Sequence, residues 1–441
     1  MNLLPSPFSV PAATPYYPEF PLYALRVRSA VPWEFNGWKP ESLSWKKGCY
    51  IHGGLSGPGG QFLFRGPQAA EFLASICVNG FEKFRVGAAK HAVMCTDDGL
   101  IASHGVMQRI APDTFRLFAA GPWAAYQHSR TKLDVEMVAE NNYLFQVAGP
   151  TSLQTLEAAT GEELKDIAFL RYRDSVIAGH KVQIMRIGMA GTLAYEIHGP
   201  MEEGPAVYDA VFRAGAPFGI ERLGWMTYTV NHVEGGFPQA NWTFFGAAQE
   251  DPGFISFVNG AKNVRWAPPT YSGSVDPANR RARYRTVSEV GWESSVKLDH
   301  DFKGRAAIER ELADPQRTIV TLEWNADDVI DVYASLFREG QEFKYVEMPT
   351  SPHFRIMLAH ADKVTIGGRE VGVASGTCYS YHFRKMISLC TIDRASAAEG
   401  TEVIVHWGDF GGRIKEIRAR VARFPYLSEG RNQIVDVSAR R

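Results

Sequence analysis

The sequence predicts an α+β protein with more than one domain. Its 441 residues exceed what a single hydrophobic core usually holds. Short apolar strands pass repeatedly through Gly-Pro into helix-like segments, whereas the C-terminal part is rich in strand-like runs. No GxGxxG motif follows a strand and opens a helix, so a dinucleotide-binding fold is not expected.

Three strand-to-helix units carry the first pattern. Glycine permits the sharp exit from the strand, and proline suits the first turn of a helix, where its missing N–H would be unpaired anyway. Apolar residues spaced by three and four then indicate a helix lying on a sheet. We expect ferredoxin-like α/β pieces built from units that contain residues 62–67 (FLFRGP), 143–150 (YLFQVAGP) and 195–200 (YEIHGP).

The pattern changes along the rest of the chain. Residues 247–285 are rich in Pro, Gly, Asn and Arg, which predicts a long insertion that serves as a functional or interface loop. From about residue 318, glycine-punctuated strand-like runs such as 318–324 (TIVTLEW) and 403–407 (VIVHW) follow one another. They predict a C-terminal β-barrel or sandwich domain.

Composition narrows the class of partner. The formal net charge is −1, so no global field attracts nucleic acid or an anionic membrane. Five cysteines without CxxC spacing argue against disulfides and zinc knuckles, and the twelve histidines show no metal-ligand spacing. No apolar run is long enough to span a bilayer, and the proline-rich start does not fit a secretory signal. We expect a cytoplasmic protein that binds a small molecule and no metal; its oligomeric state stays open.

Two segments carry the most specific signal. Residues 186–197 (RIGMAGTLAYEI) place an acidic residue on a strand, and residues 223–237 (LGWMTYTVNHVEGGF) hold an aromatic and amide cluster. The first resembles the folate-binding signature of the glycine-cleavage T-protein superfamily. The second is most similar to its tetrahydrofolate-dependent aryl O-demethylases, which act on vanillate and syringate. The resemblance covers about residues 35–430.

This resemblance implies a three-domain T-protein-like fold with discontinuous domains. We expect a folate-binding domain 1 from residues 1–60 and 138–235 and a domain 2 from residues 61–137 and 236–315, which includes the 247–285 insertion. Residues 316–441 would form the C-terminal β domain.

The resemblance also implies a tetrahydrofolate site. Glu196 would accept hydrogen bonds from the pterin N3–H and 2-amino group, a planar pair that suits a carboxylate. The alternative is an exposed strand glutamate paired with a lysine. Arg186 and Tyr195 are expected to hold the pterin or the aminobenzoyl-glutamate tail, although Arg186 could instead be a structural ion-pair partner. Asn231 and Glu234 are also expected at the cofactor, the alternative being a capped loop that packs on the core. Phe237 stands where related demethylases carry a tryptophan against the folate.

Tyr228 is the predicted catalytic acid. Breaking an aryl ether expels a phenoxide, which leaves poorly until a proton reaches its oxygen. A phenol with an ordinary pKa near 10 is closely matched to the phenol it must protonate. Related demethylases carry a tyrosine here in a similar Tyr-x-x-Asn-x-x-Glu arrangement.

Two positions depart from the family pattern. Where T-proteins place an aspartate near the reactive end of folate, the matching residue is His104, either a base or a structural histidine. The vanillate enzyme binds the substrate carboxylate through an arginine in the segment corresponding to 117–122 (LFAAGP), which has none. Either another cation binds the substrate carboxylate, with Arg26, Arg28 and Arg116 the nearest suggestions by sequence, or the substrate is uncharged. His52 is expected to line the methyl-donor pocket, or to sit in a glycine-rich turn.

The function implied is transfer of a methyl group from an aromatic methyl ether to N5 of tetrahydrofolate. A small aromatic molecule would be the substrate. The alternatives keep the fold and change the donor to a methylenedioxy aromatic, a sulfonium or an aminomethyl group, or make the chain a folate-binding protein without turnover.

Overall fold

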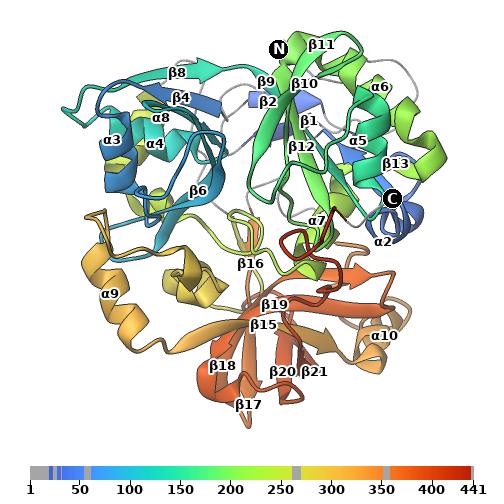
Figure 1. Ribbon diagram of the computed structural model, residues 1–441. Helices are drawn as coiled ribbons and strands as arrows, with labels where there is room; N and C mark the ends of the chain where they lie inside the picture. Colours follow the sequence, from blue (N-terminus) through green and yellow to red (C-terminus); the bar gives the residue numbers. More distant parts are fainter. Residues whose placement is uncertain are drawn as a thin grey trace.

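Three bodies of β-sheet meet around one central helix in the computed structural model (Figure 1). The structure describes residues 19–22, 27–30, 32–53, 61–260, 270–350 and 358–438. Mixed sheets and helices with a separate closed barrel confirm the predicted α+β class.

Sheet 1 is six-stranded and its helices cover one face. Its order is β10 (Tyr172–Ile177), β11 (His180–Met185), β12 (Ala194–Pro200), β9 (Asn142–Ala148), β3 (Cys49–His52) and β13 (Ile220–Arg222). Helices α5 (Ser152–Thr160) and α6 (Gly204–Gly215) share an apolar core with this sheet. Both follow the predicted Gly-Pro exits, so these two strand–helix units are confirmed.

Alternation along β12 sends its side chains to two different environments. Tyr195 and Ile197 enter the core under the helices. Glu196 and His198 therefore lie on the opposite face, since successive side chains of a strand alternate. That face meets sheet 2, where Phe118 packs against His198 with ring centroids 4.6 Å apart.

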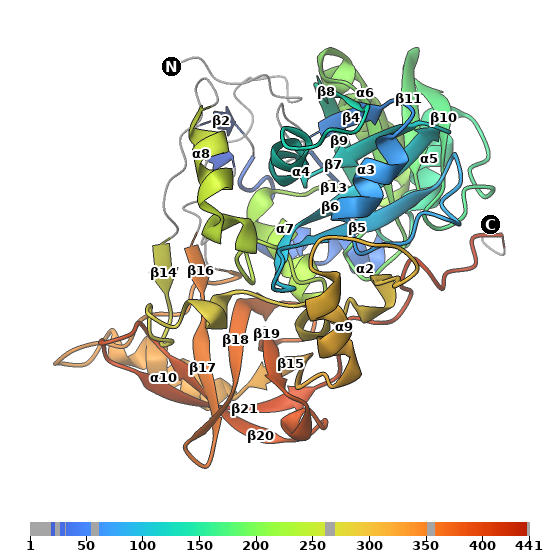
Figure 2. The same cartoon turned by 90° about the vertical axis from the view of Figure 1, so that its left-hand side faces the viewer.

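Sheet 2 repeats the arrangement with five strands. Its order is β5 (Ala89–Cys95), β6 (Ile101–Ala111), β7 (Thr114–Phe118), β4 (Gln61–Arg65) and β8 (Glu136–Glu140). Helices α3 (Ala69–Ile76), α4 (Gly121–His128) and α8 (Pro252–Gly260) pack on one face, as Figure 2 shows from the side. The third predicted Gly-Pro unit, β4 to α3, is confirmed here.

The C-terminal strands close into a barrel rather than a sandwich. Its order is β15 (Arg317–Trp324), β19 (Lys385–Asp393), β18 (Arg369–Ser380), β17 (Asp362–Ile366), β20 (Glu402–Trp407) and β21 (Lys415–Ala422). Helix α10 (Ala326–Ser335) contributes to the same apolar core. Of the two architectures predicted for this part, the barrel is the one observed.

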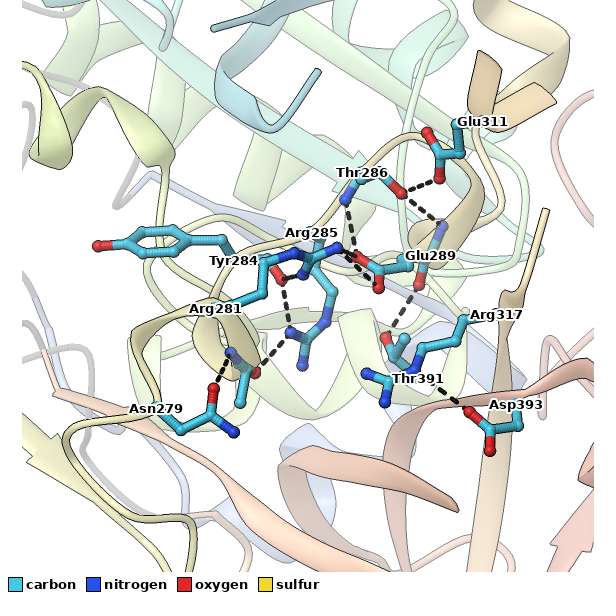
Figure 3. A network of polar contacts seen from close by, with 11 residues as sticks. Asn279, Arg281, Tyr284, Arg285, Thr286, Glu289, Glu311, Arg317, Thr391 and Asp393 are labelled. Carbon is cyan, nitrogen blue, oxygen red and sulfur yellow. Dashed lines mark hydrogen bonds and ion pairs between the residues drawn. The ribbon is translucent and has the colours of Figure 1, made fainter. Parts of the chain in front are cut away.

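The predicted insertion at 247–285 is partly regular structure. It contains α8 and strand β14 (Thr270–Ser272), which pairs in parallel with β16 (Leu358–His360); residues 261–269 lie outside the described part. A polar network then anchors its end (Figure 3). Arg281 pairs with Glu289, Thr286 N donates to Glu289, and Thr391 of the barrel donates to the Glu289 carbonyl. The insertion thus links sheet 2 to the barrel.

Helix α7 (Trp225–Glu234) occupies the centre, where it contacts β18 and β19 of the barrel. Its Tyr228 and Asn231 contact His52 and Tyr50 of sheet 1. The C-terminal segment returns beside it, and Leu427 N donates to the Glu234 carbonyl. Three helices and a two-stranded hairpin complete the α-helices and strands that the structure describes: α1 (Trp38–Glu41), α2 (Ser44–Lys47), α9 (Arg305–Ala313), and β1 (Glu19–Leu22) with β2 (Val27–Ala30).

Three further observations bear on the predictions. The strands of sheets 1 and 2 come from residues 49–222 and 61–140, so sheet 1 is interrupted by sheet 2 in sequence; the domain boundaries themselves remain a proposal. All five cysteines are free and buried. Among the described residues, no helix is both long and apolar enough to cross a membrane.

Candidate active site

A cluster of aromatic rings surrounds Tyr228 in the middle of α7. The fully buried Tyr228 ring stacks on His52 of β3, with 3.9 Å between centroids and 9° between planes. Trp225, about one helical turn earlier, stacks on Tyr228 at 5.6 Å, and Trp242 meets Tyr228 edge-on at 5.9 Å. We call these four rings the Tyr228 cluster. Such contacts on several sides hold the phenol in one orientation.

His52 enters this cluster as a neutral hydrogen-bond acceptor. Its Nδ1 lies 2.9 Å from the Leu223 carbonyl, which can only accept, so Nδ1 carries the proton. Burial lowers the pKa of His52 to about 4, against the opposing effect of the Leu223 bond. The Nε2 atom is buried and has no hydrogen-bond partner among the described residues. The ring therefore offers an unused lone pair beside Tyr228.

A row of polar side chains crosses sheet 1 next to the cluster. His52 stands opposite Gln146, and Gln146 stands opposite Glu196, in the antiparallel register of β3, β9 and β12. Directly opposite residues share a face, with Cβ atoms about 5 Å apart. The predicted pterin carboxylate is thus two strands away from the ring that stacks on Tyr228.

Asn231 of α7 joins this row through Tyr50. The Tyr50 hydroxyl donates to Gln146 Oε1, and Asn231 Nδ2 donates to the Tyr50 oxygen at 2.9 Å. Burial raises the pKa of Tyr50 well above its ordinary value, and the Glu196 carboxylate adds to the effect, so the hydroxyl keeps its proton. The network fixes both amide orientations and leaves Gln146 Nε2 as a donor and Asn231 Oδ1 as an acceptor.

Four polar atoms of these residues are buried without a hydrogen-bond partner in the described part of the chain. They are Gln146 Nε2, Asn231 Oδ1, His52 Nε2 and Glu196 Oε2. The Glu196 oxygen lies 3.3 Å from His198 Nε2, and neither atom completes a hydrogen bond. Because proteins pair most buried polar atoms, such a concentration indicates a polar ligand at this face. One donor and three acceptors remain to be satisfied.

Two predicted cofactor residues do not reach this row, and their assignments are corrected. The Arg186 guanidinium donates to the Asn432 side chain and to the Asn432 and Val435 carbonyls, so it anchors the C-terminal segment. Tyr195 lies under the helices, on the face of β12 opposite to Glu196. Neither side chain faces the row: Arg186 holds the C-terminal segment, and Tyr195 belongs to the core under the helices.

Glu234 is likewise a structural residue rather than a cofactor contact. Its Oε2 accepts from Trp45 Nε1 at 3.0 Å and from Lys46 Nζ, and its Oε1 accepts from Ser380 Oγ at 2.5 Å. Both side chains of the Lys46–Glu234 pair are buried, at 5% and 0% exposure. The pair ties α2, α7 and the barrel together.

We expect Glu234→Ala to lower the free energy of unfolding by about 3–5 kcal/mol, because it leaves the Lys46 ammonium buried without its partner. Urea unfolding measures this loss. The double variant Lys46→Met/Glu234→Leu removes both charges and should recover much of the stability. Equal destabilisation by the single and double variants would contradict the structural assignment.

The predicted base His104 has both ring nitrogens engaged. The Ala240 N–H donates to Nε2 at 3.1 Å, so the proton sits on Nδ1, which lies 3.1 Å from His91 Nε2. Burial holds the pKa of His104 well below its ordinary value, and His91 and His232 add to the effect. We therefore assign His104 to holding the loop after α7 against β6, and no longer to base catalysis.

The remaining predicted residues have mixed outcomes. Phe237 is half-buried between His104 and Trp292, so its place as a wall of the cofactor site stays a prediction. Arg116 forms a two-point pair with Glu140 at 2.5 and 2.9 Å, which leaves it poorly placed to bind a substrate carboxylate. Arg26 lies outside the described residues, as does the Arg28 side chain.

Sequence reasoning missed Gln146, Tyr50, Trp242 and His198. For Gln146 a signal exists, because it shares one face of the strand 142–148 with Leu144 and Ala148, opposite the apolar residues Phe145 and Val147. For Tyr50 and Trp242 no local signal exists, since their roles depend on contacts with residues about 180 and 14 positions away.

Acid sensitivity follows from the buried histidines. Burial lowers the pKa of His52 to about 4 and that of His232 to about 3. An unfolded histidine titrates near 6.5, so between about pH 6.5 and 4 the unfolded chain binds more protons and stability falls as pH falls. At pH 5 each histidine should cost about 2 kcal/mol of stability relative to pH 7.5.

Urea unfolding at pH 7.5 and 5.0 measures this loss. His232→Gln should reduce the difference between the two pH values. A His232→Gln variant with the pH dependence of the unmodified protein would contradict the assignment.

Comparison with known proteins places this arrangement in a family. The family described as GCVT N-terminal domain matches residues 58–242. A sesamin methylene transferase of a Sinomonas species is 40% identical over 422 residues, which cover 93% of each chain. The chain belongs to the T-protein superfamily. Within this superfamily, a syringate O-demethylase of a Sphingobium species is 29% identical over 93% of each chain.

The T-protein fold is also seen in a solved structure. The glycine cleavage system aminomethyltransferase T from Bartonella henselae has a TM-score of 0.67 at 16% identity, covering 94% of this chain and 95% of that one. The predicted three-part T-protein-like fold is thereby confirmed. As a T-protein superfamily member with full-length transferase relatives, the chain is an enzyme.

Proposed function

We propose that this chain transfers a one-carbon group from an aromatic ether to tetrahydrofolate. In the main form of the proposal the donor is a methoxyarene, and the products are a phenol and 5-methyltetrahydrofolate. The full-length relatives named syringate O-demethylase and sesamin methylene transferase support this class of reaction.

The observation that carries the proposal is the set of unpaired buried atoms beside Tyr228. Glu196 Oε2 suits the paired pterin donors N3–H and 2-amino, a charge-assisted interaction. Gln146 Nε2 suits the pterin carbonyl, and Asn231 Oδ1 remains for another ring N–H. One donor and several acceptors therefore fit the hydrogen-bonding pattern of a reduced pterin.

When bound, tetrahydrofolate supplies a nucleophilic nitrogen, N5, that accepts the one-carbon group. The chain supplies the rest. Tyr228 donates its proton to the departing aryl oxygen, and the proton that N5 would give up on accepting the carbon would restore the tyrosine. Stacking on His52 keeps the Tyr228 ring in one orientation. His52 Nε2 accepts a hydrogen bond from a hydroxyl of the aromatic donor, since its lone pair is unused. Holding both reactants in line contributes about 7–11 kcal/mol to lowering the barrier.

A second donor is favoured by one specific observation. The relative at 40% identity is a methylene transferase, whereas the O-demethylase is 29% identical. A methylenedioxyarene would use the same groups, but both C–O bonds of its methylene carbon would break. The two protons given up by N5 and N10 would end on the two catechol oxygens, with Tyr228 as the donor to an aryl oxygen, and the carbon would arrive at the oxidation level of a methylene group. The folate product then distinguishes the two donors.

The test is incubation with tetrahydrofolate and paired donors, a methoxyarene and the methylenedioxyarene of the same ring. Mass spectrometry follows the aromatic product and the folate species together. We expect a phenol or catechol to form in step with 5-methyl- or 5,10-methylenetetrahydrofolate, and neither to form when tetrahydrofolate is omitted. Aromatic product without folate, or tight folate binding with no product from any donor, would contradict the proposal.

A further inference from the structure

We propose that a pocket between β6, α4, α8 and the loop after α7 binds the uncharged remainder of the aromatic donor and so selects neutral substrates over benzoates. This inference rests on the proposed function and names the substrate class of its site. The pocket is lined by apolar side chains, including Ala119, Trp123 and Phe254, and by three amides, Gln239, Asn241 and Gln249.

Charge is the first argument. No lysine, arginine, aspartate or glutamate occurs among the described residues that line the pocket. Its one titratable residue, His104, has both nitrogens engaged by Ala240 and His91. A carboxylate placed here would lose its hydration without gaining a cation, which is costly in a partly apolar site. The segment 117–122, which lacks an arginine, contributes Ala119 and Pro122 to this wall.

Unpaired polar atoms define what the ligand must offer. Trp123 Nε1 and Gln249 Oε1 are buried and have no hydrogen-bond partner in the described part of the chain. Trp123 is 1% and Gln249 6% exposed. Gln249 Nε2 donates to Asn241 Oδ1 at 3.2 Å, which fixes the amide and leaves its oxygen as an acceptor. An indole donor and an amide acceptor suit an oxygen-substituted neutral arene, whose ether oxygen accepts and whose hydroxyl donates.

Backbone geometry points to the same place. Ala119 and Asn241 adopt positive φ angles of 69° and 70°, a conformation that side chains other than glycine rarely take. Within the described residues only five non-glycine positions have positive φ, and two of the five line this pocket. Strain of this kind concentrates at binding sites, where the surrounding structure holds it.

The pocket adjoins the Tyr228 cluster through a shared loop. Trp242, which packs on Tyr228, directly follows the pocket residue Asn241. His104 holds this loop by accepting from Ala240 N–H. The same short segment therefore places Asn241 at the pocket and Trp242 at the Tyr228 cluster. A donor whose ether oxygen lies at Tyr228 would extend its remaining substituents along this wall.

Binding of non-transferable probes tests the inference without folate or turnover. The matched pair is 3,4-diethoxybenzamide and 3,4-diethoxybenzoate, which differ in charge but hardly in shape, and 4-benzyl-1,2-diethoxybenzene tests for larger neutral groups. Calorimetry should show the amide binding at least tenfold more tightly than the benzoate. It should also show the benzyl compound binding at least as tightly as the amide.

Two variants locate the probe. Ala119→Arg should bring the benzoate to equal or better affinity than the amide, and Trp123→Phe should weaken the amide about fivefold by removing one donor. Melting temperatures check that each variant is folded, and the test needs only one of the two variants to be folded. Equal binding of amide and benzoate to the unmodified protein would overturn the inference. Folded variants in which neither the amide affinity nor the benzoate affinity changes would also overturn it. Selective neutral binding without any one-carbon transfer would instead contradict the proposed function and leave the pocket assignment standing.

Discussion

Tyr228→Phe should lower kcat for demethylation by about 10²–10⁴-fold while the KM for the aromatic donor changes little. The substitution keeps the ring that stacks on His52 and removes the only proton that this ring can deliver. Because the donor still packs against the same rings, binding survives and the loss falls on the chemical step. Steady-state kinetics with saturating tetrahydrofolate measure both constants.

The leaving group provides the decisive control. A donor whose departing phenol is acidified by a nitro group needs less protonation, so the variant's defect should shrink as the pKa of the leaving phenol falls. Tyr143→Phe makes the same change in a fully buried tyrosine on the helix-covered face of sheet 1 and should retain activity. A defect of constant size across leaving groups would remove Tyr228 from the acid role.

Glu196→Gln should raise the KM for tetrahydrofolate about 10–150-fold. The amide keeps the shape of the side chain but loses a charge-assisted bond worth about 1.5–3 kcal/mol, and it turns one acceptor into a donor facing the pterin donors. Donor KM should hardly move, because Glu196 lies two strands away from His52 and the Tyr228 cluster.

Direct binding separates this effect from a folding defect. Fluorescence titration with tetrahydrofolate should show the same loss for Glu196→Gln, whereas Glu202→Gln, an exposed glutamate just after β12, should bind normally. Unchanged folate affinity in Glu196→Gln would mean that the pterin lies elsewhere.

The fold was predictable wherever local rules decide it. Gly-Pro exits into helices at 66–67 and 149–150 are determined by backbone conformation within a few residues, and the structure confirms both. The choice of barrel over sandwich was not predictable, because closure depends on pairing between β15 and β21, about 100 residues apart.

The same limit explains the site. Glu196 and Tyr228 were predicted from short motifs; Glu196 lies in the row of polar side chains on sheet 1, and Tyr228 stacks on His52 at the end of that row. The cofactor role predicted for Arg186 was wrong because its partners Asn432 and Val435 are nearly 250 positions away in the sequence. The same role was wrong for Glu234 because its partner Lys46 is 188 positions away. Tyr195 could have been excluded, since adjacent strand residues face opposite sides.

The most direct test of the central claim uses an aromatic donor labelled with ¹³C in its methoxy or methylenedioxy carbon. Tetrahydrofolate from a completed reaction is examined by mass spectrometry. The proposed function predicts that the label appears on folate in equal amount to the phenol or catechol released, and that Tyr228→Phe reduces both together. Label found in free formaldehyde or methanol with unlabelled folate would contradict it.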